Sequence, residues 1–288
     1  MTEIQNKFRI HRSPTANSGS CGKKVPLAQI NAPDFDFKAQ FQPDLLVKKS
    51  DWWVVKKSQP WAICDCMIID TGERQRSSFA EFSQDELCSL FNLAEKIAGV
   101  LKRRGVKKII IGANINHEIE STNLDKVLLR LHLHVLGFSD DELSKMEEIT
   151  FEELEKENPA IENYLFDPML EKFKEKILPI LGSGSAKSSL GISVNLAGDL
   201  NAITKRDFCD EVRKVDREIA KQFPALSYSF CLDCSDKIAL TLSPCSVFGK
   251  GVLEAIGIIL KRDDGVGISP EDQTKREEFF EKVRKEIL

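Results

Sequence analysis

Apolar and polar positions repeat along this chain with periods that predict short strands around long helices. Residues 52–55 and 62–69 are strand-like apolar runs, and the polar, proline-containing segment between them favours an antiparallel pair. From Ser83 the apolar positions recur at helical intervals, and Glu86 completes the spacing of a capping box. We therefore expect an amphipathic helix that ends near Gly105.

The stretch after this helix contains the most unusual strand in the chain. We expect a strand over 107–112, a polar loop over 113–118 and a second strand over 128–138. The second strand includes Arg130-Leu131-His132-Leu133-His134-Val135, with two of the chain's four histidines. Because side chains alternate along a strand, the arginine and both histidines are expected to share one face, while the intervening apolar residues face a core.

The remainder of the chain again alternates between strands and helices. Residues 139–181 are mostly helical and acidic in pattern, and 182–189 is rich in glycine and serine, which predicts a flexible segment. The elements expected after it are a strand over 190–196, a helix over 204–223, strands over 226–231 and 237–242, an apolar segment over 252–260, and a helix from Ser269. A long helix followed by paired strands partly repeats the first half, so an internal duplication is a hypothesis.

Composition limits the class of protein. Of the 288 residues, 42% are hydrophobic, which is ample for packed cores, and the net charge of −4 argues against nonspecific nucleic-acid binding as the main task. No apolar run approaches the roughly 20 residues of a membrane helix, and residues 1–14 lack an apolar signal region. We expect a soluble, cytoplasmic protein that does not bind membranes.

The eight cysteines are too few for a disulfide scaffold in a chain of this length, and several lie in apolar strand-like runs. Cys231 and Cys234 have the spacing of half a zinc site, and Cys64 and Cys66 form a second close pair. Neither pair has a second pair nearby to complete four ligands. Reduced, buried thiols are therefore the favoured interpretation.

The strand with Arg130, His132 and His134 suits a phosphate group, because arginine donates through a charged planar fork and histidine can donate, accept or attack. Four interpretations stay open: polar groups satisfied in a core, a metal site with His117 as third ligand, phosphate binding without catalysis, and nucleophilic attack at phosphorus. The last is favoured. In it His132 attacks the α-phosphorus of a nucleotide, while Arg130 and His134 hold the non-bridging oxygens.

The segment Leu131-His132-Leu133-His134-Val135-Leu136-Gly137 resembles the signature of the histidine triad superfamily, with Arg130 in place of the first histidine. The resemblance implies that His132 is the nucleophile and His134 the third histidine of the triad. It also implies nucleotide contacts from the loop before the strand, where the candidates are Asn114, Asn116, Ser121, Thr122 and Asn123. Ordinary turn chemistry is the alternative for each of them.

Three segments of the second half, 237–244, 247–255 and 268–273, resemble the C-terminal half of galactose-1-phosphate uridylyltransferases, which carry two histidine-triad-like halves in one chain. The resemblance implies an α+β fold with two such halves, each an antiparallel sheet with packed helices. Arg130 stands where those proteins commonly have a zinc-binding histidine, so neither a metal nor another cofactor is expected. The expected domains are an N-terminal arm over 1–44, a catalytic domain over 45–181, a linker over 182–189 and a degenerate second domain over 190–288.

The implied activity is transfer of a nucleoside monophosphate through a covalent intermediate on His132, with phosphate or a sugar phosphate as acceptor. Such a protein is a nucleotidyltransferase or a nucleotide phosphorylase. A nucleotide hydrolase of the same superfamily is one alternative. A catalytically degenerate nucleotide-binding protein is another, because the chain also lacks the family's Pro-Lys pair and has Val127 where a serine is usual. If the halves pack as the family's dimers do, one chain forms a pseudo-dimer.

Overall fold

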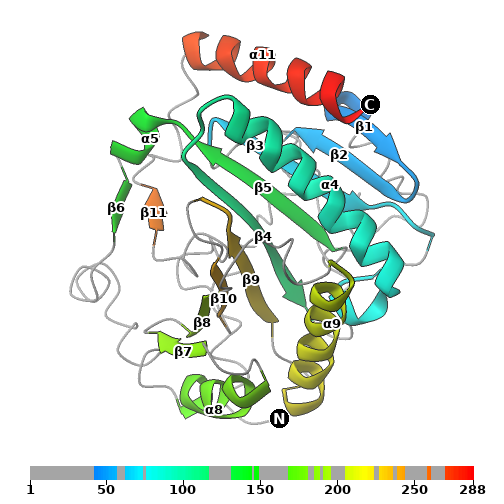
Figure 1. Cartoon of the computed structure of the whole chain (residues 1–288), viewed down its shortest axis with the longest axis vertical. Coiled ribbons are helices and arrows are strands. Elements are labelled where there is room, and N and C mark those ends of the chain that lie inside the picture. Colours follow the sequence, from blue (N-terminus) through cyan, green and yellow to red (C-terminus); the bar gives the residue numbers. More distant parts are fainter. Residues whose placement is uncertain are drawn as a thin grey trace, which may run out of the picture.

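The computed structural model describes residues 42–56, 62–73, 76–116, 131–144, 146–148, 168–180, 185–188, 191–195, 205–223, 227–235, 239–243, 258–260 and 270–288 (Figure 1). Its strands are β1 (Leu45–Lys49), β2 (Trp52–Lys56), β3 (Cys64–Asp70), β4 (Lys108–Asn116), β5 (His132–Phe138), β6 (Met146–Glu148), β7 (Ser185–Ser188), β8 (Gly191–Asn195), β9 (Ser227–Asp233), β10 (Ala239–Ser243) and β11 (Ile258–Leu260). Its α-helices are α4 (Gln84–Arg103), α5 (Asp140–Ser144), α8 (Pro168–Ile177), α9 (Lys205–Gln222) and α11 (Pro270–Ile287), and short 3-10 helices include η3 (Phe79–Glu81).

A nine-stranded antiparallel sheet forms the centre of the described part of the chain, in the order β1-β2-β3-β5-β4-β9-β10-β8-β7. The β4–β9 pair joins the two sides of this sheet, with Gly112 opposite Cys231 and Asn116 opposite Ser227. Strands β6 and β11 pair separately. The expectation of an α+β protein built on an antiparallel sheet is confirmed.

Helix α4 covers one face of the sheet (Figure 1). The predicted capping box is present: the Ser83 hydroxyl accepts from the Glu86 amide at 3.2 Å, and the Glu86 carboxylate accepts from the Ser83 amide at 2.7 Å. At the other end Gly105 adopts φ 80, and the amides of Gly105 and Val106 donate to the carbonyls of Lys102 and Leu101. This is a Schellman motif, in which glycine takes the left-handed position without steric cost.

The buried side of α4 packs onto β5. Leu90, Ile97 and Leu101 of the helix and Leu133 and Val135 of the strand are all fully buried in one hydrophobic cluster. Burying each such side chain stabilises the fold by roughly 1.5–3 kcal/mol. The same cluster places the odd-numbered residues of β5 on the α4 side, so that the even-numbered residues lie on the opposite face of the sheet.

Aromatic rings extend this core from α4 to the second half of the chain. Phe79 of η3 contacts Phe230 of β9 edge-on, with ring centroids 5.1 Å apart, and Phe91 of α4 contacts Phe208 of α9 at the same centroid distance. Edge-to-face pairs of this kind stabilise beyond the area they bury. The packing therefore ties α4 and α9 together over the β4–β9 junction.

The sheet shows the same strand order twice. Strands β2, β3, β5 and β4 follow one another on one side of the junction, and α4 connects β3 to β4. Strands β7, β8, β10 and β9 follow one another in the same way on the other side, and α9 connects β8 to β9. The two four-stranded sets have the same connectivity.

Several segments differ from the expected elements, among them strand β1, which was not expected. Strand β4 continues through Asn116, although a loop was expected from 113, because pairing with β9 supplies hydrogen-bonding partners to the end of the strand. The segment 182–189, expected as a linker, contains strand β7. Among the described residues no helix is both long and apolar enough to cross a membrane.

Candidate active site

The two histidines of β5 lie side by side on the sheet face opposite α4. His132 is half-buried and His134 is buried, with their ring centroids 5.2 Å apart and their planes at 72°. The strand register gives their neighbours on the adjoining strands. Ile69 lies opposite His132, and Met67 and Gly112 lie opposite His134. The alternation of β5 thus brings two imidazoles into one row, with a glycine on the adjoining strand.

A buried carboxylate holds His134. Asp65, on β3, is fully buried, and its Oδ1 lies 3.2 Å from Nδ1 of His134. An ionised carboxylate can accept a hydrogen bond but cannot donate one, so Nδ1 carries the hydrogen when Asp65 is charged. Nε2 is then the acceptor in the neutral ring and becomes a donor when His134 is protonated. Asp65 therefore orients the imidazole and stabilises a positive charge on it.

The thiols beside Asp65 lie in the buried interior. Cys64 and Cys66 are buried, and burial raises the pKa of both thiols well above the ordinary value. The same cause raises the pKa of Cys231, and it raises that of Cys234 to about 12. All four thiols are therefore protonated at neutral pH. No cluster of three or more His, Cys, Asp or Glu side chains that could hold a metal occurs in the described residues.

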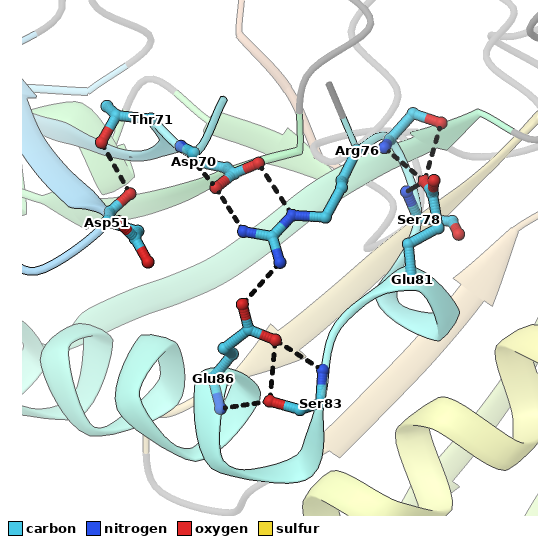
Figure 2. A network of polar contacts seen from close by, with 10 residues as sticks. Asp51, Asp70, Thr71, Arg76, Ser78, Glu81, Ser83 and Glu86 are labelled. Carbon is cyan, nitrogen blue, oxygen red and sulfur yellow. Dashed lines mark hydrogen bonds and ion pairs between the residues drawn. The ribbon is translucent and has the colours of Figure 1, made fainter. Parts of the chain in front are cut away.

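A charged network fixes the chain next to the histidine strand (Figure 2). Arg76 donates to both oxygens of Asp70, at 2.8 and 3.2 Å, and to Glu86 at 2.6 Å. Asp70 is fully buried at the end of β3, and Glu86 lies in the first turn of α4. The bidentate pair satisfies a carboxylate that would be costly to bury alone.

The same network sets the ionisation of Glu86. Burial by itself raises the pKa of this carboxyl, but hydrogen bonds from the Arg76 guanidinium and from the amide and hydroxyl of Ser83 outweigh it and lower the pKa from 4.5 to about 2. Glu86 is therefore charged at neutral pH, and it links the start of α4 to the loop after β3.

This loop also holds the start of β5. The carbonyl of Arg76 accepts a hydrogen bond from the Leu131 amide at 2.6 Å, and the carbonyl of Leu131 accepts one from the Asp70 amide at 3.1 Å. Leu131 directly precedes His132, and its side chain is buried. The Arg76 network therefore fixes the backbone from which His132 projects.

The other residues expected at the site are described only in part. Asn114 and Asn116 belong to β4 rather than to a loop, and their backbones lie opposite Ser229 and Ser227 of β9. Arg130, Ser121, Thr122, Asn123 and His117 lie outside the described residues.

Asp65 and Arg76 belong to the site but were not expected from the sequence. A charged residue at the centre of an otherwise apolar strand was a signal for Asp65, since such a group is buried with a partner. For Arg76 the sequence offers no comparable signal, because an arginine in a polar loop is ordinary.

Comparison with known proteins gives remote likenesses. No family model matches the chain, and no curated protein matches it. Among solved structures, a DUF4931 family protein from Bacillus cereus is 12% identical, covering 83% of this chain and 99% of that one with a TM-score of 0.41. Yeast Ap4A phosphorylase Apa2 in complex with Ap4A is 12% identical, covering 84% of this chain and 81% of that one with a TM-score of 0.42. At this level of similarity the side chains of the site, rather than the neighbours, decide which function can be proposed.

Proposed function

We propose that the chain is a nucleotidyltransferase or nucleotide phosphorylase that transfers a nucleoside monophosphate through a covalent intermediate on His132. The observation that carries the proposal is the row of Asp65, His134 and His132, which joins a buried carboxylate to two imidazoles in contact. If the histidines had only a structural role, buried His134 would not need the imidazole of His132 on its solvent side. Group transfer needs both a nucleophile and a neighbour that carries charge.

The difference in burial between the two histidines supports a different role for each. The nucleophile has to reach a phosphorus atom that arrives from solvent, and His132 is half-buried whereas His134 is only 3% exposed. His134 is held through Nδ1 by Asp65, so a contact from its ring to a phosphate oxygen would come from Nε2. These differences support His132 as the proposed nucleophile and protonated His134 as the proposed donor to a phosphate oxygen.

The proposed reaction has two steps. A ring nitrogen lone pair of neutral His132 forms a bond to the α-phosphorus, and the bond from that phosphorus to the bridging oxygen breaks, so that the leaving phosphate takes the electron pair. The acceptor oxygen then attacks the same phosphorus, the nitrogen–phosphorus bond breaks, and the electron pair returns to His132. Asp65 stabilises the positive charge on His134 that balances the phosphoryl oxygens in both steps.

Further contacts to the nucleotide complete the proposal. Gly112 of β4 lies opposite His134, and Asn114 and Asn116 are the next residues along β4 at every second position. This spacing supports a nucleotide contact from that part of β4. Arg130 is proposed as the cation beside His132, and Ser121, Thr122 and Asn123 as further nucleotide-binding residues. Phosphate or a sugar phosphate is the proposed acceptor.

The repeated strand order supports an internal duplication. We assign the chain to the histidine triad superfamily as part of this proposal, with a catalytic half over 45–181 and a degenerate half over 190–288 to which strand β7 (Ser185–Ser188) also belongs. The equal connectivity of β2–β5 and β7–β10, joined through β4 and β9, is what a pseudo-dimer of two such halves requires.

A substrate panel tests the proposal and separates its alternatives. Nucleoside triphosphates and dinucleoside polyphosphates, labelled at the α-phosphorus, are incubated with the full chain and with phosphate, a sugar phosphate or neither. We expect turnover that depends on phosphate or sugar phosphate and is lost in His132→Ala. Turnover by water alone at the full rate identifies a hydrolase instead, and nucleotide binding without turnover identifies a degenerate binding protein. Unchanged turnover in His132→Ala refutes the assignment of the nucleophile.

A further inference from the structure

Two cysteines from different halves of the chain meet where α4 and α9 pack against each other. The Sγ atoms of Cys88 and Cys209 are 3.2 Å apart, although 121 residues separate them in the sequence. Cys88 is half-buried, and Cys209 is fully buried. Both thiols are reduced in this structure.

The meeting follows from the way the two helices pack. Each cysteine lies four residues after the start of its helix, Gln84 in α4 and Lys205 in α9. Asp85 and Arg206, the second residues of the two helices, also contact each other at 2.9 Å. Residues at matching positions meet in pairs when two elements are related by a local twofold axis. The cysteine pair therefore lies close to such an axis between α4 and α9.

We propose that Cys88 and Cys209 form an oxidation site, at which a disulfide crosslinks α4 to α9. A disulfide bond is about 2.05 Å long, so the two sulfur atoms have to approach by about 1.2 Å. The crosslink ties together the two halves of the sheet on the α4 side. This inference rests on the helix packing and is independent of the proposed transferase activity.

Oxidised glutathione supplies the oxidising equivalents. The Cys88 thiolate attacks one sulfur of oxidised glutathione, forms a mixed disulfide and releases one glutathione thiolate. The Cys209 sulfur then attacks the Cys88 sulfur and releases the second glutathione, and the two thiol protons go to the released thiolates. One protein disulfide forms, and one glutathione disulfide is reduced to two glutathione thiols.

Peptide mapping of the full chain tests the proposal. The reduced protein is incubated with oxidised glutathione, digested without reductant and analysed by mass spectrometry. We expect a crosslinked peptide pair containing Cys88 and Cys209, lighter than its two components by two hydrogen atoms and separated again by dithiothreitol. Because the ring closed by this bond is long, we expect the oxidised protein to melt roughly 5 °C higher than the reduced protein.

Variants control for oxidation elsewhere. Cys88→Ser and Cys209→Ser are expected to lose both the crosslink and the melting shift, whereas Cys234→Ser, which removes a buried thiol at another place, keeps both. The proposal is overturned if glutathione stays on Cys88 without a crosslink, or if the crosslink joins other cysteines. It is also overturned if neither thiol reacts in the native protein under conditions that oxidise the urea-unfolded chain.

Discussion

Replacing Asp65 by asparagine tests the charge behind His134. The two side chains have nearly the same shape, so the substitution leaves the packing of β3 in place and removes the negative charge at 3.2 Å from Nδ1 of His134. An asparagine oxygen can still accept the Nδ1 hydrogen. The change therefore separates orientation of the imidazole, which is kept, from stabilisation of its positive charge, which is lost.

The size of the effect follows from the geometry. At 3.2 Å the Coulomb interaction of two unit charges is about 5 kcal/mol for an effective dielectric of 20, before desolvation is subtracted. Hydrogen bonds to charged groups contribute about 1.5–3 kcal/mol net. Since 1.36 kcal/mol corresponds to a factor of ten in rate, we expect kcat to fall about 10- to 150-fold in Asp65→Asn. KM is expected to change little, because the charge on His134 matters most in the transition state.

Steady-state kinetics with the best substrate of the panel measure this effect, and urea unfolding reports the stability of each variant. Asp233→Asn serves as a matched control, because Asp233 lies on the same sheet but pairs with Lys108 and Ser235. Its turnover is expected to match that of the native chain. A kcat for folded Asp65→Asn within threefold of the native value refutes a charged His134 in the reaction.

Three further predictions concern the frame of the site. Arg76→Met leaves the fully buried Asp70 without its bidentate partner, and we expect the unfolding free energy in urea titrations to fall by about 3–5 kcal/mol. Adding Asp70→Asn is expected to restore part of this loss. Equal losses in the single and double variants contradict the pairing. Because the pKa of Glu86 is lowered from 4.5 to about 2, its ionised form contributes stability above pH 4.5 that is lost as the pH falls toward 2. Glu86→Gln is thus expected to flatten the decline in unfolding free energy over that interval, and an unchanged slope argues against the lowered pKa. In Gly137→Ala the new Cβ would lie 2.8 Å from Cδ2 of Leu101, a contact that forces repacking. We expect this to lower the unfolding free energy by about 1–3 kcal/mol in the same titrations. Full native stability means that β5 and α4 pack less closely than described.

The sequence predicted the elements that depend on residues close to each other along the chain. The capping box at Ser83 sets the start of α4, and the alternation of β5 places the even-numbered residues on one face, because both depend on residues within a few positions of each other. The contact between Asp65 and His134 depends on the register between β3 and β5, which spacing along the chain does not specify. For the same reason the extension of β4 to Asn116 was missed, since its partner strand begins at Ser227.

The most direct test of the account is to isolate the intermediate on His132. The full chain is mixed with an α-labelled nucleotide without acceptor, quenched in base, digested and analysed by mass spectrometry. We predict one nucleoside monophosphate on the peptide that contains His132, stable in base, released by acid, and absent from His132→Ala. Consumption of the nucleotide with no adduct on His132, or with the adduct on another residue, contradicts it.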